Sequence, residues 1–404
     1  MSSDRDIVRE LAARVAEIAN SEENAFRRSL WNDVNSLRLP PRPPAICHPD
    51  PFCWQEILPQ DQIVSEDPFL AGVEYQLRQF LYKNWVGDDT VLEPFWPVGV
   101  ALELEGEHLW GLPIGYDHTG VDRGAWRYVP PVQEEADLDK IVPPSFRYNA
   151  QATEDCASRM DELLGDILPV RIVGSLPLYP AWLHGWATQL CGVQELLLYM
   201  MDRPQWVHRL MGKLRDGVLA AMDQVEAMSV LTLDNKGIMS CDDLPKPGFD
   251  GAHARLCDLW GRGESQEFQG VSPRQFEEFL LRYQMPLLER FGLTLYGCCE
   301  DLTNKIDLVL SIPNLRKFVC SPWTNLETLV EAVGDRYCIE WRQKATDIVF
   351  ASDPVPVRAN LERGLRIAKA TPTQIVFQEL ETLNGDPDRL RNWARMAVEA
   401  GEKG

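Results

Sequence analysis

The pattern of apolar and polar residues changes about a quarter of the way along the chain. Over residues 1–38, apolar side chains such as Leu11 and Val15 recur at steps of three and four, which predicts helices. The proline-rich stretch 39–54 excludes a helix and predicts an extended arm lying on the main body. The stretch 60–85 again has helical spacing, so we expect the first 94 residues to form a helical and proline-rich extension.

From about residue 95, short β-branched runs alternate with longer helical stretches. The runs are 98–105, 169–176, 229–235, a weaker one at 256–268, 293–299, 316–322, 336–341 and 374–380. Strands separated by helices pair in parallel, and about eight such units predict an α/β fold, a (β/α)8 TIM barrel over residues 95–404. A doubly wound open sheet is the alternative, but no G-x-G-x-x-G turn follows the first run.

Composition excludes several classes of protein. The chain has 404 residues, of which 45% are hydrophobic and 25% charged, as in ordinary globular proteins. Its net charge of −21 argues against a nucleic-acid partner, which requires basic patches. The sequence lacks an apolar stretch of the length of a membrane span, and its first residues lack the apolar centre of a secretory signal. We therefore expect a cytoplasmic protein that does not bind membranes.

Thiols and carboxylates follow the predicted strands, where a parallel barrel gathers its chemistry. They are Glu267, Cys298, Cys299, Glu300, Cys320 and Glu340. If the strand continues, Tyr296, Cys298 and Glu300 share one face. Thiolate and carboxylate ligands together suit Zn²⁺, although neither C-x-x-C nor H-E-x-x-H occurs. Buried small residues capped by a solvated glutamate are the alternative interpretation, and a vicinal disulfide would require a strained ring.

Residues 258–325, DLWGRGESQEFQGVSPRQFEEFLLRYQMPLLERFGLTLYGCCEDLTNKIDLVLSIPNLRKFVCSPWTN, resemble the uroporphyrinogen-decarboxylase-like superfamily. More closely, they resemble its corrinoid-dependent methyltransferases, which include aromatic O-demethylases. The likeness extends from about Tyr148 to Phe350, and YGCCE and SQEFQGVSP are its most specific parts. The resemblance implies a TIM barrel, a catalytic zinc ion at the barrel mouth and a partner protein that carries the corrinoid.

The resemblance also implies a set of zinc ligands. Related enzymes use an H-x-C pair on the fifth strand and a later cysteine. Tyr296 stands at the position of that histidine, Cys298 keeps the cysteine, and the run QIVFQEL has no later one. The ligand set must therefore differ. We expect Cys298, with Glu267, Cys299 and Glu300 as further candidates and Cys320 after them. The arginine-rich N-terminal motif of true uroporphyrinogen decarboxylases is missing.

Other residues are candidates for substrate contacts and proton transfer. Trp182, Trp260, Trp323 and Trp341 are candidates for an aromatic pocket, with Glu340 reshaping it. His184 is a candidate proton donor to the leaving oxygen. Asp234 and Asp258 could hold a substrate hydroxyl, and Tyr296 is a candidate catalytic group. Core packing for each tryptophan and a structural role for the histidine are the alternatives.

Three functions follow from these patterns. The first is a zinc-dependent methyltransferase that moves a methyl group from a small methoxylated, aromatic substrate to the Co(I) corrinoid of a partner protein. The second is a metal-free lyase of decarboxylase type acting on a small carboxylated substrate. The third is a barrel that binds a ligand without catalysis. Self-association as a homodimer stays open. The cysteine–glutamate cluster favours the first function, because neither alternative needs thiols at the strand ends.

Overall fold

A computed structural model describes residues 3–121, 124–233, 244–251 and 253–403 of the chain. The strands are β1 (Ala45–Pro49), β2 (Trp96–Gly99), β3 (Leu102–Leu104), β4 (Gly115–His118), β5 (Trp126–Val129), β6 (Phe146–Tyr148), β7 (Val170–Val173), β8 (Trp260–Gly263), β9 (Leu293–Tyr296), β10 (Leu315–Cys320), β11 (Cys338–Arg342) and β12 (Thr373–Leu380). The prediction of a mixed α/β protein is confirmed.

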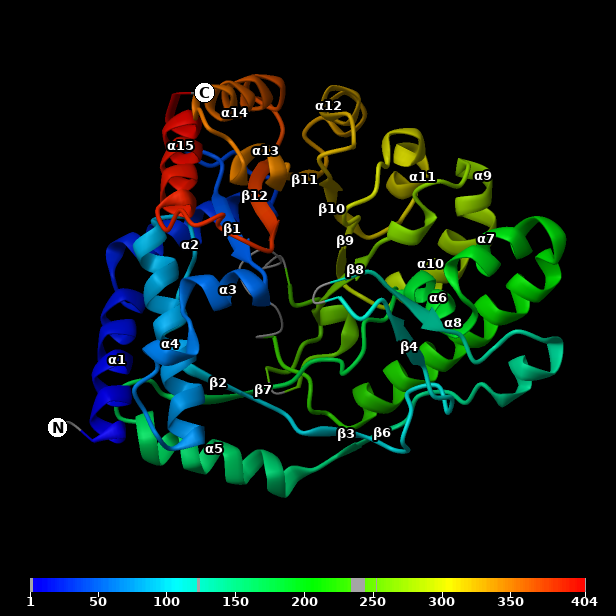
Figure 1. Cartoon of the computed structure of the whole chain (residues 1–404), viewed down its shortest axis with the longest axis horizontal. Coiled ribbons are helices and arrows are strands. Elements are labelled where there is room, and N and C mark those ends of the chain that lie inside the picture. Colours follow the sequence, from blue (N-terminus) through cyan, green and yellow to red (C-terminus); the bar gives the residue numbers. More distant parts are fainter. Residues whose placement is uncertain (1–2, 122–123, 234–243, 252, 404) are drawn as a thin grey trace.

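The helices cover the outer side of these strands (Figure 1). They are α1 (Asp4–Ala19), α2 (Glu22–Asn35), α3 (Pro51–Ile57), α4 (Pro68–Val86), α5 (Ala150–Leu164), α6 (Leu183–Cys191), α7 (Val193–Asp202), α8 (Pro204–Ala227), α9 (Pro273–Phe276), α10 (Arg282–Leu288), α11 (Ile306–Leu310), α12 (Leu326–Val333), α13 (Ala345–Val349), α14 (Val355–Ile367) and α15 (Arg389–Lys403). Short helical turns are η1 (Gln60–Gln62), η2 (Glu135–Lys140), η4 (Leu256–Asp258), η5 (Gln266–Phe268), the π-helical η6 (Glu277–Leu281) and η7 (Thr303–Lys305).

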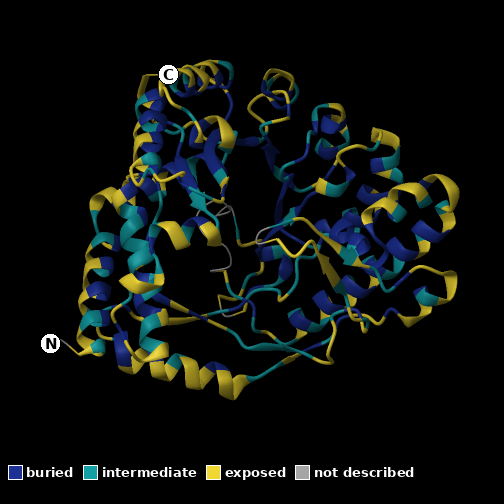
Figure 2. Ribbon diagram, viewed as in Figure 1, coloured by how far each residue is buried: buried dark blue, intermediate teal, exposed yellow. Residues whose placement is uncertain are grey.

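A curved sheet of six parallel strands forms the centre of the molecule, in the order β1-β12-β11-β10-β9-β8 (Figure 1). Its strands are buried, and the exposed residues lie on the outer faces of the helices (Figure 2). Buried strands of this kind read as continuous apolar runs, which is why the last four were predictable. Because the strands are parallel, their carboxyl ends lie along one edge of the sheet. The loops after β8, β9, β11 and β12 meet at this edge.

A closed eight-stranded barrel is not seen in the part of the chain that the structure describes. β2 and β7 form a separate parallel pair, and β3–β6 and β4–β5 are antiparallel pairs. The predicted strand at 229–235 is not a strand over 229–233, although Thr232 N donates to Gly174 O at 3.1 Å beside the end of β7. Asp234 and the rest of that run lie outside the described residues.

β1 corrects the expectation of an arm lying on the main body. Its residues pair in parallel with β12, with Ile46 opposite Val376. The prolines stand before the strand and at its end, so the pairing residues between them keep their backbone N–H groups. β1 precedes residue 94, so the extension that we predicted contributes a strand to the main sheet.

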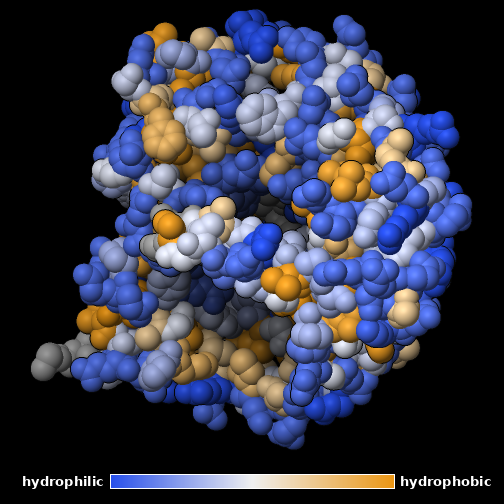
Figure 3. Space-filling model, turned by 45° about the vertical axis from the view of Figure 1, so that its right-hand side comes forward, coloured by the Kyte–Doolittle hydropathy of each residue, from blue (hydrophilic) through white to orange (hydrophobic). Residues whose placement is uncertain are grey.

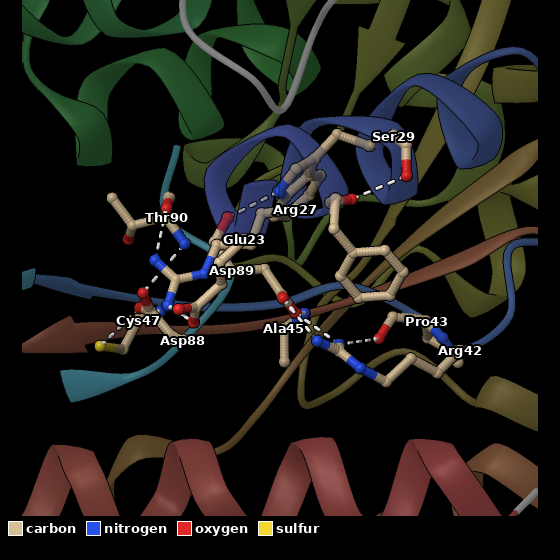
Figure 4. A network of polar contacts seen from close by, with 12 residues as sticks. Glu23, Arg27, Ser29, Arg42, Pro43, Ala45, Cys47, Asp88, Asp89 and Thr90 are labelled. Carbon is tan, nitrogen blue, oxygen red and sulfur yellow. Dashed lines mark hydrogen bonds and ion pairs between the residues drawn. The ribbon is translucent and has the colours of Figure 1, made fainter. Parts of the chain in front are cut away.

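A buried polar network fixes β1 against the turn after α4 (Figure 4). Arg42 makes a bidentate ion pair with Asp89, with both N–O distances at 2.7 Å. Asp89 also accepts from Ala45 N at 2.8 Å, and Asp88 accepts from Cys47 N at 2.9 Å. These carboxylates satisfy the donors on the side of β1 that faces away from β12. The network therefore protects an edge of the sheet.

The N-terminal helices α1 and α4 pack with α5 and β2 in a second hydrophobic cluster. Helix α1 begins with a capping box in which Ser3 and Asp6 bond reciprocally. Among the described residues, no helix is both long and apolar enough to cross a membrane.

Candidate functional site

The chain turns sharply where β9 ends. Gly297 has a φ of 116°, and a Cβ there would lie 2.9 Å from Val319 Cβ. Only glycine fits this conformation and this close approach. The strand alternation therefore stops at Tyr296, and the following residues do not continue on its two faces.

Glu300 binds the loops together. Its side chain is fully buried and accepts from Ser265 N at 2.7 Å, from Ser265 Oγ at 2.9 Å and from Cys298 N at 2.9 Å. Its backbone oxygen accepts from Ser321 Oγ at 2.7 Å. Glu300 thus joins the loops after β8, β9 and β10, and both of its carboxylate oxygens already accept hydrogen bonds.

Cys298 and Cys299 lie side by side, with their sulfur atoms 3.4 Å apart. The single S–H proton of Cys299 lies between two acceptors, Cys298 Sγ and Glu379 Oε1, the second at 2.7 Å from Cys299 Sγ, and Arg342 Nη1 lies 3.6 Å from Cys298 Sγ. The hydrogen bond from Cys299, the charge of Arg342 and a bond from Glu264 lower the pKa of Cys298 to about 5, although burial opposes the change. The same pairing raises the pKa of Cys299. The site therefore holds a thiolate beside a thiol donor.

Glu264 is the second titratable group of the site, and the sequence analysis missed it. It follows β8 directly and is buried. Burial first, and then the Cys298 thiolate, raise the pKa of Glu264 to about 8. At neutral pH its carboxyl group is therefore protonated beside a thiolate. The sequence did contain a signal for Glu264, because this carboxylate directly follows a short strand.

His184 is the second residue of helix α6 and is fully buried. Its Nδ1 contacts Glu267 Oε2, and its Nε2 is buried without a hydrogen-bond partner among the described residues. Burial raises the pKa of Glu267, but the bond and charge of His184 lower it overall. His184 also interacts with Glu264, whose pKa it lowers. A carboxylate that fixes one imidazole nitrogen while the other is free is the usual arrangement of a histidine that binds metal.

A cavity of about 400 Å³ lies on the inner face of the curved sheet, next to this cluster. Its polar lining includes His48, Tyr179, Arg262, Glu340 and Arg342. Figure 3 shows that the molecule is hollowed near its middle, with a mostly hydrophilic rim. The size suits a small organic molecule.

The four candidate tryptophans do not form one pocket. Trp260 lines the cavity, whereas Trp341 faces the opposite side of β11 and packs on Gly364 of α14. Trp182 packs edge-on against Trp186, with ring centroids 4.7 Å apart. Trp323 is 55% exposed.

Of the remaining candidates, Glu340 lines the cavity. The others lie apart from it or have structural roles. Tyr296 is buried on the outer face of β9 and donates to Gln284 Oε1 at 2.8 Å. Asp258 accepts from Arg255 Nε at 2.8 Å and from backbone N–H groups, so it caps a loop. Cys320 is buried and lies 3.6 Å from Thr324 O.

The donor chemistry of Cys298, Glu264 and His184 fits zinc, which accepts thiolate, imidazole and carboxylate ligands. The orphaned Nε2 of His184 supports that fit. Within the described ranges, however, no three or more His, Cys, Asp or Glu side chains are gathered as in a formed metal site.

The fold and the site thus define an α/β protein with a thiolate after a parallel strand and, on helix α6, an imidazole nitrogen that has no partner among the described residues. No family model matches the chain, and no curated protein matches it. Among solved structures, the chain is similar to a methyltransferase from Methanosarcina mazei, with 11% sequence identity and a TM-score of 0.48. The alignment covers 93% of this chain and 97% of that one.

Proposed function

We propose that this chain is a zinc-dependent methyltransferase that takes a methyl group from a small methoxylated compound. The proposed acceptor is the Co(I) corrinoid of a partner protein, as the sequence resemblance implies. The observation that carries the proposal is the buried Nε2 of His184, which has no described partner while Glu267 fixes the other nitrogen. A structural histidine in a core normally has both nitrogens satisfied or exposed.

The proposed zinc ligands are Cys298, His184 and Glu264, and their side chains would have to move together on binding, because the described residues hold no gathered set of three. Zinc would act as a Lewis acid on the ether oxygen, which otherwise leaves badly. Cys298 is already a thiolate, so binding there costs no deprotonation, whereas Glu264 would release its proton. Cys299 and Arg342 would hold the thiolate in place through the contacts described above.

The adjacent cavity would bind the substrate. Its lining combines apolar side chains with a few polar ones, which is the usual composition of a site that orients a small molecule. The corrinoid protein would have to approach the strand ends around Cys298, because the methyl group must be reached from outside the cavity.

A lyase acting on a carboxylated substrate is the second candidate. The observation that favours it is the pair of arginines, Arg262 and Arg342, in one cavity. Such a lyase would need neither the thiolate nor the unpaired imidazole nitrogen.

Metal analysis separates the two candidates. We would measure zinc by mass spectrometry in protein purified without a metal-affinity tag, beside Cys298→Ala and His184→Gln. The control is Cys320→Ala, a buried thiol outside the site. We expect about one zinc ion per chain, lost in the first two variants and kept in the control. A native protein that takes up no zinc on reconstitution would contradict the methyltransferase proposal and favour the lyase.

Methyl transfer is the second stage of the test. The zinc-loaded protein is mixed with a methoxylated aromatic compound and free cob(I)alamin, and the demethylated phenol is quantified. We expect the phenol to form with the native protein and the control, and not with Cys298→Ala.

A further inference from the structure

Three aromatic rings gather on one face of the β4–β5 hairpin. The antiparallel register places Tyr116 opposite Tyr128 and His118 opposite Trp126, so these side chains share a face. The ring centroids of Tyr116, Trp126 and Tyr128 lie 4.8–5.5 Å apart in every pairing. Their planes meet at angles of 52–82°, so the rings form the walls of a corner and not a stack.

This aromatic corner, made of Tyr116, Trp126 and Tyr128, is open to solvent. Tyr116 is 52% exposed and Trp126 is 50% exposed, whereas Tyr128 is partly buried. None of the three belongs to the hydrophobic core clusters of the described residues. Cross-strand packing explains why the rings touch, but it does not explain why two of them stay half in water. A gathered and exposed aromatic surface is typical of a binding site.

In the part of the chain that the structure describes, no arginine or lysine covers these rings. By contrast, the guanidinium of Arg391 lies 5.0 Å from the ring centroid of the exposed Trp85. The arginine of the hairpin itself, Arg127, is on the opposite face, where its Nε donates to Asp117 Oδ2 at 3.0 Å. The ring faces of the aromatic corner are therefore available to a ligand from outside the chain.

The charges around the aromatic corner favour a cation. Gln189 Nε2 on α6 lies 3.5 Å from Tyr128 Oη, so the corner adjoins this helix. Burial raises the pKa of Tyr128, Gln189 opposes this change, and the charge of Glu267 raises the pKa further. Glu267 has a lowered pKa, as described above, and is ionised at neutral pH. The chain as a whole carries a net charge of −21, so its field attracts cations and repels anions.

The chemistry of aromatic rings narrows the ligand further. The faces of tryptophan and tyrosine attract a cation through their negative quadrupole, and tryptophan does so most strongly. A primary ammonium group is strongly hydrated and needs hydrogen-bond acceptors, which ring carbons do not supply. A quaternary ammonium group has no N–H to satisfy, and its methyl groups pack against flat apolar walls.

We propose that the aromatic corner binds a small quaternary ammonium ion, with Trp126 as its principal contact and Tyr116 and Tyr128 beside it. None of the described residues that line the 400 Å³ cavity belongs to the hairpin. The inference does not rest on the proposed function, because it requires neither zinc nor the Cys298 thiolate. It gives the protein a second binding site, for an organic cation.

Binding is measured by NMR titration with choline and with 3,3-dimethyl-1-butanol, the neutral molecule of the same shape. The variants are Trp126→Leu and Trp126→Phe. The control is Trp85→Leu, which removes an exposed tryptophan that already carries Arg391. Loss of one cation–ring contact weakens binding about 2- to 30-fold. We expect that loss for choline in Trp126→Leu, a smaller loss in Trp126→Phe, none in the control, and weaker binding of the neutral molecule throughout.

Two results would overturn the inference. One is that choline does not bind, or binds equally to the native protein and Trp126→Leu. The other is equal binding of choline and the neutral molecule by the native protein, which would show that charge plays no part. Folding is checked by the melting temperature without ligand. We expect both Trp126 variants to melt with the native protein, because this ring lies outside the core clusters. A large fall in both variants would make Trp126 structural and refute its role as a contact.

The inference and the proposed function fail separately. Cys298→Ala should bind choline as the native protein does, and loss of binding in this variant would place the cation in the cavity and overturn the inference. If choline binds at Trp126 but the protein takes up no zinc, the cation site stands and the methyltransferase proposal does not. If methyl transfer occurs and choline does not bind, the reverse holds.

Discussion

The Cys298 thiolate depends on a neighbour that can be changed without touching Cys298 itself. The bond from Cys299 is the largest cause of the lowered pKa of Cys298, which is about 5. Cys299→Ala removes that donor. A hydrogen bond to a charged group contributes roughly 1.5–3 kcal/mol, and one pKa step corresponds to about 1.4 kcal/mol. We therefore expect the pKa of Cys298 in Cys299→Ala to rise to roughly 6–7.

The assay is alkylation by iodoacetamide across a pH series, on chelator-treated protein, followed by mass spectrometry of the modified peptide. The rate reports the thiolate fraction, so its midpoint gives the pKa of Cys298. Cys299→Ser keeps a donor and should stay near the native midpoint. Cys156, an exposed thiol on α5, serves as an internal check on the reagent.

A midpoint near 9 in the native protein would show that the contacts of Cys298 do not stabilise its thiolate. Equal midpoints in the native protein and Cys299→Ala would show that the neighbouring thiol is not the cause. Either result would refute the reasoning. The second would indicate that Arg342 is the main cause of the lowered pKa of Cys298.

Three further predictions concern stability, measured by urea unfolding. The pKa of Glu264 is raised to about 8, so the stability that this group contributes is full below about pH 4.5 and is lost as the pH rises through 8. The free energy of unfolding of Glu264→Gln should therefore rise relative to that of the native protein between pH 5 and pH 8.5. A difference in free energy that stays constant over this range would contradict the prediction. Lys83→Met leaves the Asp88 carboxylate buried and unpaired and should cost about 3–5 kcal/mol, whereas a neutral effect would show that the pair is dispensable. Gly364→Ala places a Cβ 2.1 Å from the Trp341 indole and should cost about 1–3 kcal/mol, and an unchanged midpoint would mean that α14 shifts freely.

Sequence reasoning found the partly exposed β7 within its predicted run 169–176, as well as the strands that are buried on both faces. β9, β10, β11 and β12 are short β-branched or aromatic runs between clear helices, and each lies within or close to its predicted range. β1 was missed because its flanking prolines were taken as signals against regular structure, although a proline at a strand end removes no ladder bond there. The β4–β5 hairpin was missed because each strand has only four residues, although Tyr116, Trp126 and Tyr128 alternate with polar residues and contact one another on one face.

The sequence predicted which residues of the site follow the strands, but it did not predict their orientations or their partners. The loop 298–300 was correctly placed after a strand, but the face of each residue depends on Gly297, whose positive φ the sequence does not reveal. By contrast, Glu340 and Trp341 are adjacent on β11, so alternation alone places them on opposite faces. The partners Glu264 and Glu379 come from other strands, and only the sheet order brings them to Cys298 and Cys299.

The two arginines of the cavity have different neighbours, and that difference separates their roles. Arg342 lies between Glu340 and Cys298, so its charge is used to hold the carboxylate and the thiolate. A substrate anion placed on Arg342 would compete with both and would weaken the thiolate that the chemistry needs. Arg262 also lowers the pKa of Cys298 and the pKa of Glu340, but in both cases Arg342 has the larger effect. Both arginines therefore favour the charged forms of Cys298 and Glu340, and Arg342 does so more strongly because it contacts both.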